Sequence, residues 1–566
     1  ARAIVVAGLA EASERHPVVV ALPTSTDAER LAHDLRAFLG EDQVDTFPAW
    51  ETLPFERMSP SVETMGRRLR AMWRLRSPER MPKVLVAPVK ALVQRLGPHV
   101  EDAEPVVITA GAVLDTEDLL ARLVDAGYRR EYQVEHRGEV AVRGNIVDVY
   151  PSTADGPVRV DLWGDEVERL SEFAVADQRS TGDLERVEIF GCRELRPTPE
   201  VRERAARLVA AEPWGRDNWE RLAQGLVFDG MESWLPWLTE GEHLLPDLVG
   251  PDAQVLLVEP RRMRDRAAEL LDEEAALAAS LATTWGAVGH GVGFPPLHLP
   301  FDRLLAHTTA PVWSITPMPD GPGAPAVPAT GWDPVVGDGS RLAKQLGELV
   351  ADRFTVVVAA DGEGSRTRLE AALREEGVVG LPVVVAPIER GFVLPSVKLA
   401  VLSESDVTGR RRAHRRPRPR PRSSAGFFDD LAPGDYVVHH SHGVGRYAGM
   451  VTRALAGTER DYLLVEYRGG DKLYVPSDQI DLIRPYTGGE SPSLHRLGGT
   501  DWGRTRARVR SAVADIAQEL VVLYRKRRTT AGRAFGGDTP WQQEMEEAFE
   551  YIETPDQAKA IVEVKA

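Results

Sequence analysis

Short apolar runs alternate with amphipathic segments in the first 105 residues of the chain. Residues 18–22 (VVVAL) are all apolar, and apolar side chains then recur with helical spacing through residues 31–39. The same order returns at residues 84–87 and the segment after them. A buried strand followed by an amphipathic helix is the repeating unit of a parallel sheet. We therefore predict a parallel α/β domain at the beginning of the chain.

Strand-like alternation dominates from residue 106 to residue 198, after one predicted helix at residues 116–125. The segment VRVDLW ends at Trp163 and places Val and Leu on one face, with Arg, Asp and Trp on the other. A Trp on the solvent face favours a protein interface, since Trp and Arg dominate binding hot spots. The alternative is that Trp163 folds over the following turn and is partly buried. The predicted strands are residues 132–135, 138–143, 145–150 and 157–162.

Strands and helices then alternate again. Residues 255–259 and 310–317 are predicted to complete the first sheet, which makes the domain before them an insertion. After a Pro/Gly-rich linker at residues 321–334, a small α/β domain follows, and it contains no readable chemistry. Short strands broken by turns between residues 431 and 486 need closure into a small barrel to remove their edges.

The fold class predicted is therefore a multidomain α/β protein with an inserted α+β domain, a small β-barrel and a long helix. An apolar stripe at helical spacing predicts that helix at residues 502–528. The predicted segments are a first α/β part (1–105), the insertion (106–198), a second α/β part with linker (199–334), the small α/β domain (335–406), an Arg/Pro linker (407–428), the barrel (429–487), the long helix (488–532) and the start of a further domain (533–566).

Composition narrows the possible functions. The chain has 566 residues, ample for several cores, and its net charge of −17 disfavours nonspecific binding to nucleic acid. Cys192 is the only cysteine, which excludes an intrachain disulfide or a multi-cysteine zinc site and fits a reducing cytoplasm. We expect Cys192 to be buried and find no signal peptide or long apolar run. The chain is expected to be a fragment at both ends.

Eight arginines fall between Arg410 and Arg422, interleaved with prolines. Such a run is strongly hydrated and extended. A solubilising linker is the favoured interpretation, and transient contact with phosphates is the alternative.

The segments HGVGRY, DYLLVEY and KLYVP, between residues 442 and 476, resemble the polymerase-interacting module of bacterial transcription-repair coupling factors, a module shared with CarD-like regulators. The first α/β domain resembles UvrB without its phosphate-binding loop, and no Gly-Lys pair occurs in the chain. The resemblance implies a scaffold that binds the β subunit of RNA polymerase and recruits UvrA, with a spacer role for the small α/β domain. A CarD-like regulator and a UvrB-like helicase are the alternatives.

The resemblance also implies site residues. RGNIVDVYP and VRVDLWGDEVERL are similar to the UvrA-binding domain of UvrB, which places UvrA contacts at Arg143, Arg159 and Trp163. The family more often has Phe at the last position. An exposed barrel edge can bind a partner strand through its unpaired backbone groups. The family's polymerase contact maps onto the strand that contains Met450, Val451, Thr452, Arg453 and Leu455.

The tail resembles the start of a double-stranded-DNA translocase motor, in which an aromatic residue and a Gln hold adenine. Those roles fall on Phe549 and Gln557. Thr554 and Pro555 also fit the beginning of a helix. The phosphate loop and the magnesium-binding motif are absent from the chain, so we expect no catalysis, cofactor or metal here. The resemblance assigns ATP, Mg²⁺ and double-stranded DNA to the motor of the parent protein, and no membrane partner.

Overall fold

The computed structural model separates into two compact units, residues 1–498 and 499–566, and the elements named below belong to the first. Nothing beyond residue 505 is described, which leaves most of the predicted helix at 502–528 and the adenine-site residues Phe549 and Gln557 outside the described part. The structure describes residues 1–505 except 53, 56–57, 176–177, 240, 285–292, 320, 322–323, 333–338, 379, 409–432, 456–457, 477–481, 487–491, 498–500 and 503.

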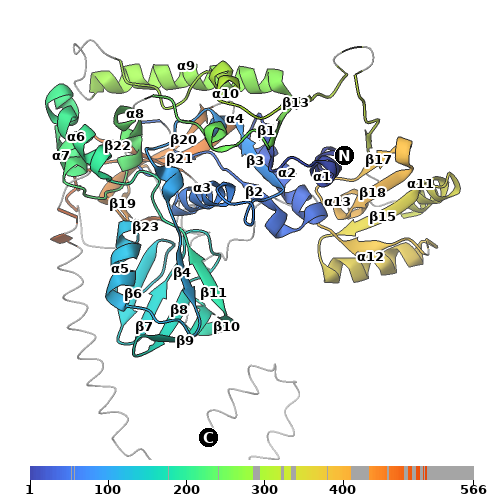
Figure 1. The fold of residues 1–566 in the computed structure, drawn as a ribbon, viewed down its shortest axis with the longest axis horizontal. Coiled ribbons are helices and arrows are strands. Elements are labelled where there is room, and N and C mark those ends of the chain that lie inside the picture. Colours follow the sequence, from blue (N-terminus) through green and yellow to red (C-terminus); the bar gives the residue numbers. More distant parts are fainter. Residues whose placement is uncertain are drawn as a thin grey trace, which may run out of the picture. The chain divides into compact units, whose positions relative to one another are not determined.

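A five-stranded parallel sheet forms the first domain, as predicted (Figure 1). Residues 254–258 pair with the first strand, and residues 312–315 pair with residues 254–258, so the intervening domain is an insertion. In sheet order the strands are β13 (Val312–Ile315), β12 (Gln254–Val258), β1 (Val18–Leu22), β3 (Val84–Pro88) and β2 (Val44–Thr46).

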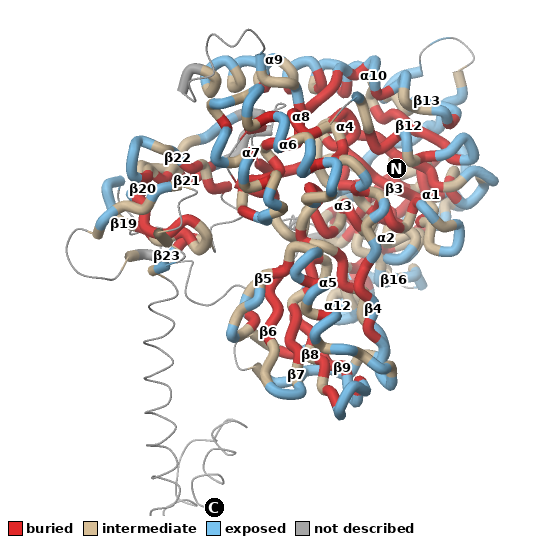
Figure 2. The backbone as a smooth tube through the Cα atoms, turned by 60° about the vertical axis from the view of Figure 1, so that its left-hand side comes forward, coloured by how far each residue is buried: buried red, intermediate tan, exposed pale blue. Residues whose placement is uncertain are grey.

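Both faces of this sheet are covered by helices. Val18 and Val20 pack with α1 (Arg2–Ala12) and α2 (Ser25–Leu39) in one apolar cluster. Val19 and Ala21 of β1 belong to a second cluster on the other face, and the strands of this sheet are buried in Figure 2. Side chains of successive strand residues point to opposite faces, so a continuous apolar run is required here. The second cluster includes residues of α3 (Val62–Leu75), α4 (Val89–Leu92), α9 (Pro260–Thr284) and α10 (Phe301–Ala306).

The same domain also has a tryptophan-rich core of its own after the insertion. Trp219, Trp234 and Trp237 are buried, with ring centroids 4.7–6.0 Å apart. This core joins the helices α6 (Pro199–Ala211), α7 (Arg216–Ala223) and α8 (Leu235–Leu238).

The inserted domain contains a six-stranded sheet and α5 (Thr116–Asp125), whose bounds match the prediction. The predicted strand at 132–135 is wrong, because the backbone N–H groups of Glu135 and His136 donate to the Glu139 carboxylate instead of a neighbouring strand. The sheet order is β10 (Ser180–Leu184), β9 (Glu166–Phe173), β8 (Val158–Trp163), β7 (Ile146–Val149), β6 (Glu139–Arg143) and β5 (Arg129–Arg130), and β4 (Val106–Thr109) pairs separately with β11 (Arg186–Ile189).

A separate five-stranded sheet lies in the segment predicted as the small α/β domain, with α11 (Gly339–Ala351) and α12 (Glu363–Glu375) beside it. The predicted linker at 321–334 is partly wrong, because Thr330 and Gly331 pair with β17 of this domain. The sheet order is β14 (Thr330–Gly331), β17 (Phe392–Leu394), β18 (Leu399–Ser403), β15 (Thr355–Ala360) and β16 (Val383–Val385).

A five-stranded antiparallel sheet occupies residues 436–485. Among the described residues β22 and β23 end the hydrogen-bonded order, so closure into a barrel stays a prediction. No helix in the described part of the chain is long and apolar enough to cross a membrane. The sheet order is β22 (Lys472–Pro476), β21 (Thr458–Glu466), β20 (Gly443–Leu455), β19 (Tyr436–His439) and β23 (Ile483–Pro485).

Candidate functional site

Strand β8 carries the first candidate site, on the outer face of the inserted sheet. Val158, Val160 and Leu162 are at most 5% exposed and belong to the core of the domain. Trp163 is 74% exposed. The alternation therefore places the indole in solvent, and the interpretation that Trp163 is partly buried over its turn is wrong.

A buried carboxylate joins the two predicted arginines. Asp148 on β7 has no exposed surface and lies opposite Arg159 of β8 in the strand register. Its Oδ1 accepts from Arg159 Nε at 2.7 Å and its Oδ2 accepts from Nη2 at 2.9 Å. Arg143 Nη2 also donates to Oδ2. The structure thus brings Arg143 and Arg159 together around one acid, Asp148, which the sequence pattern did not mark as part of the site.

The two arginines differ in their surroundings. Arg159 Nη1 donates to the Gln178 carbonyl at 3.0 Å, and its guanidinium carbon lies 4.7 Å from the centroid of the Phe173 ring. Its side chain is 14% exposed, against 35% for Arg143. The hydrogen bond to Asp148 raises the pKa of Arg159 above its ordinary value. Arg159 is therefore a largely enclosed cation, and Arg143 is the more accessible one.

Two exposed apolar side chains, those of Trp163 and Val113, lie near each other at the end of β8. Trp163 pairs with Glu166 on β9, and Glu166 pairs in turn with Val113 through an isolated bridge. Directly paired residues put their side chains on the same face, and Val113 is 83% exposed. Trp163 and Val113 thus flank one exposed Glu166. The sequence gives no signal for Val113, because no recognisable strand surrounds it.

The second candidate site is an unpaired edge on β20. Residues 449–455 pair with β21 on one side, whereas β19 pairs only with residues 443–446 on the other. No described strand occupies the second side of residues 450–455. This is the segment predicted to accept a partner strand.

Backbone alternation shows which groups face that open edge. The N–H of Tyr467 donates to the carbonyl of Asp471, on the β22 side. Alternation then turns Tyr462 toward β20, where its register partner is Val451. Thr452 follows Val451, so its N–H and C=O point away from β21 and toward the open edge.

The side chains of this edge are exposed but locally tied. Met450 is 57% exposed. Thr452 Oγ1 donates to the Asp461 carboxylate at 2.7 Å, and Arg453 Nη2 donates to the Tyr474 hydroxyl at 3.1 Å. The side chain of Leu455 lies outside the described part, so its predicted direction stays a prediction.

The loop after β1, where a phosphate loop would lie, is closed by its own side chains. Thr24 Oγ1 accepts from the backbone N–H of Asp27 at 3.1 Å and donates to that residue's carboxylate at 2.9 Å. An acid thus stands at the beginning of α2, where a bound phosphate would be repelled.

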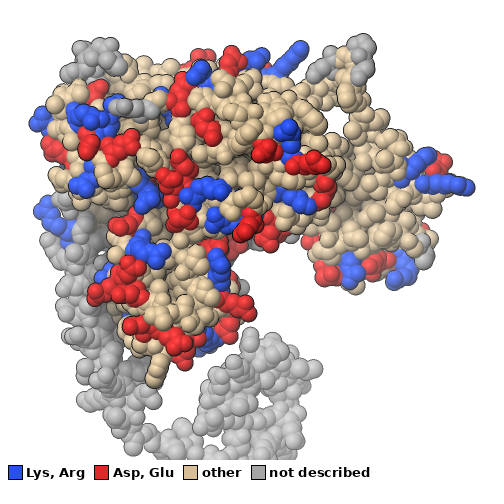
Figure 3. Space-filling view, viewed as in Figure 1, with Lys and Arg blue, Asp and Glu red and all other residues tan. Residues whose placement is uncertain are grey.

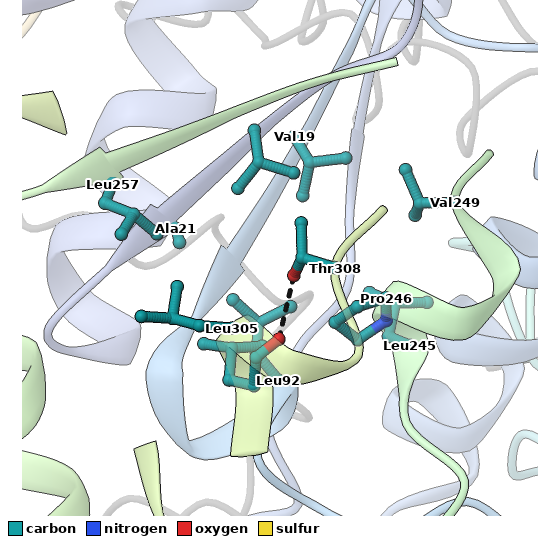
Figure 4. Close-up of a pocket in the computed structure, with 11 residues that line it drawn as sticks. Val19, Ala21, Leu92, Leu245, Pro246, Val249, Leu257, Leu305 and Thr308 are labelled. Atoms are coloured by element: carbon teal, nitrogen blue, oxygen red, sulfur yellow. Dashed lines mark hydrogen bonds between the residues drawn. The ribbon is translucent and has the colours of Figure 1, made fainter. Parts of the chain in front are cut away.

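A small cavity beside β1 and β12 is apolar and offers no unbonded polar group (Figure 4). Its one side-chain hydroxyl, that of Thr308, donates to the Leu304 carbonyl at 2.8 Å. Acidic and basic side chains are interspersed over the visible face of the inserted domain (Figure 3).

Comparison with known proteins connects both surfaces to described families. Residues 106–195 match the UvrB interaction domain, and residues 431–487 match the CarD-like/TRCF RID domain. The whole chain is 36% identical to the transcription-repair-coupling factor of Mycobacterium bovis and 29% identical to that of Bacillus subtilis. The Staphylococcus epidermidis factor is 30% identical over 95% of the chain.

The chain is homologous to transcription-repair-coupling factors. It spans about half the length of the curated relatives it matches, 50% of the Mycobacterium bovis protein and 51% of the Bacillus subtilis protein. The first matched domain contains Arg143, Arg159 and Trp163, and the second contains the open edge of β20. A regulator built on the CarD-like domain alone does not account for similarity to these factors along the whole of this chain.

Proposed function

We propose that this chain is the adaptor part of a cytoplasmic transcription-repair-coupling factor, which binds stalled RNA polymerase and recruits UvrA for nucleotide excision repair. The observation that carries the proposal is the presence of a UvrB interaction domain and a CarD-like/TRCF RID domain in one chain that matches these factors throughout. Each of the two domains offers one surface for a partner, and this arrangement is the one expected of a scaffold protein.

The UvrA contact is assigned to Arg143, Arg159 and Trp163. An exposed indole beside cations is the composition of a binding hot spot. Trp163 supplies apolar area, and the arginines favour carboxylates on the partner, since guanidinium groups bind carboxylates with two-point geometry. The exposed Val113 extends the apolar area.

The polymerase contact is assigned to the open edge of β20, with the β subunit supplying a strand. Thr452 points its backbone donor and acceptor outward, and Met450, Val451, Arg453 and Leu455 lie along the same edge. Strand addition satisfies such groups with little demand on side-chain identity. The five strands then form the small barrel of the module, as the sequence predicts.

The parent factor is proposed to be an ATP-dependent translocase on double-stranded DNA that displaces the stalled polymerase, with ATP and Mg²⁺ at its motor. Phe549 and Gln557 are assigned to the adenine end of that nucleotide site. The chain has no Gly-Lys pair to hold the β- and γ-phosphates. We therefore expect it to bind partners and not to hydrolyse ATP.

Direct binding to each purified partner tests the proposal. The chain is titrated with UvrA and, separately, with the polymerase β subunit, and ATP hydrolysis is measured with and without DNA. Binding to both partners without hydrolysis is expected. Polymerase binding without UvrA binding would instead favour the CarD-like regulator, and DNA-stimulated hydrolysis abolished by a point mutation in the chain would favour the UvrB-like helicase.

A further inference from the structure

Asp148 occupies the centre of the predicted UvrA surface without being accessible to UvrA. Its side chain is fully buried, and both of its oxygens accept hydrogen bonds from arginines on neighbouring strands. A buried carboxylate destabilises the fold unless it is paired with a cation. Burial of Asp148 therefore depends on the two arginines beside it. The acid and the arginines therefore form one unit.

Arg159 is the enclosed member of this unit. Each of its three nitrogens already donates a hydrogen bond, two to Asp148 and one to the Gln178 carbonyl. The Phe173 ring lies 4.7 Å from its guanidinium carbon, and only 14% of the side chain is exposed. A partner carboxylate could bind Arg159 only by competing with these groups.

Arg143 is the accessible member. Of its three nitrogens, Nη2 alone has an acceptor among the described residues, and 35% of the side chain is exposed. An arginine side chain has many rotamers, and ordering them opposes binding. The bond to Asp148 restricts those rotamers before a partner arrives and leaves the remaining donors available.

We propose that Asp148 is a positioning residue that directs Arg143 toward UvrA, and that Arg159 serves to hold Asp148 rather than to contact UvrA. The inference rests on the proposed function, and it divides between two roles what the family resemblance assigns to two equal contacts. It predicts that the affinity for UvrA depends on a carboxylate that UvrA never touches.

The sign of the effect separates positioning from simple electrostatics. If the group that faces Arg143 is anionic, removing the negative charge of Asp148 would strengthen binding on Coulomb grounds alone. Loss of positioning weakens binding instead. Asp161→Asn is the matched control, because Asp161 on β8 lies on the same face of the sheet as Asp148 and the substitution removes the same charge. It should change the dissociation constant by less than about 2-fold at moderate ionic strength.

A double-mutant cycle on UvrA binding by the full chain tests the inference. Arg143→Ala should weaken binding by about 30-fold, as expected of a hot-spot residue. Asp148→Asn should weaken it by about 10-fold in the original chain and by less than about 2-fold in the Arg143→Ala background. If the double variant is folded and its loss of affinity equals the product of the two single losses, the inference is overturned. Asp148 would then act independently of Arg143.

Two further outcomes are distinguishable. If Arg143→Ala leaves UvrA binding unchanged, the proposed UvrA site itself is wrong and the inference falls with it. If Asp148→Asn does not fold, the paired variant Asp148→Leu with Arg159→Met removes the buried ion pair together, a replacement that proteins often tolerate. This folded variant should still lose about 10-fold in affinity, and unchanged affinity would overturn the positioning role.

Discussion

Arg159 and Asp148 face each other across β8 and β7 and share two hydrogen bonds, of 2.7 and 2.9 Å. The carboxylate is fully buried, so the pair is part of the domain core as much as of its surface. A charge reversal at Arg159 should therefore affect the stability of the domain as well as binding to a partner.

Arg159→Glu is expected to destabilise the inserted domain. The new carboxylate would stand against the buried Asp148, and breaking a buried ion pair typically costs about 3–5 kcal/mol. Urea denaturation followed by far-UV circular dichroism measures the loss. Arg143→Glu is the matched control on the same acid, with a smaller cost because its side chain is 35% exposed. Equal stability of the Arg159→Glu variant and the original chain would show that the pair is not structural.

Trp163→Ala is expected to weaken UvrA binding by about 2 kcal/mol or more without lowering the melting temperature. The indole is 74% exposed, so its removal deletes contact area for a partner and little core packing. Isothermal titration calorimetry with UvrA measures the change. Tyr132→Ala is the control, because Tyr132 is an aromatic of the same domain that is 77% exposed. If the two variants lose the same affinity for UvrA, Trp163 does not belong to the binding site.

Thr452→Pro is expected to reduce polymerase binding while the domain stays folded. Proline removes the N–H that points to the open edge and leaves the β20–β21 ladder intact. Arg453→Pro is the matched control, because the Arg453 N–H points to β21 and its loss should destabilise the sheet. Binding to the β subunit and thermal melting are measured together. Full binding by the folded Thr452→Pro variant would show that the contact lies on another strand, such as β22.

Acidification is expected to destabilise the domain that contains His439. Burial, together with the nearby His442 and Arg129 side chains, lowers the pKa of His439 well below its ordinary value of about 6.5, although nearby Asp229 opposes the shift. The unfolded chain then binds a proton that the folded chain does not. Stability should therefore fall as the pH drops below about 6.5, by up to about 1.4 kcal/mol per pH unit.

Melting temperatures at pH 7.5 and 5.5 measure this effect. His439→Asn should reduce the drop between the two pH values, whereas His99→Gln, at a side chain that is 62% exposed, should not. An unchanged pH dependence in the His439→Asn variant would exclude His439 as its source.

Elements with a regular pattern of apolar residues could be predicted from the sequence. β1, with its five buried apolar residues, was predicted with its observed bounds, and so was α5, where Asp115 caps the first turn. β10 was missed because four of its five residues are exposed and carry no apolar pattern. β17 and β23 have three residues each, too few for a periodic signal.

The parts of the site that depend on alternation along one strand were also predictable. Alternation along β8 indicated that Trp163 is exposed, since a strand's period is fixed by the backbone. The enclosure of Arg159 was not predictable, because it depends on Asp148 from another strand and on Gln178 from a distant loop. Contacts of this kind follow from strand register, which the sequence pattern alone did not specify.

The central claim is that one chain holds UvrA and RNA polymerase through separate surfaces. Size-exclusion chromatography of the chain mixed with UvrA and the polymerase β subunit tests it most directly. A complex of all three is predicted, with Trp163→Ala losing only UvrA and Thr452→Pro losing only the β subunit. Mutually exclusive binding, or loss of both partners from either folded variant, would contradict the account.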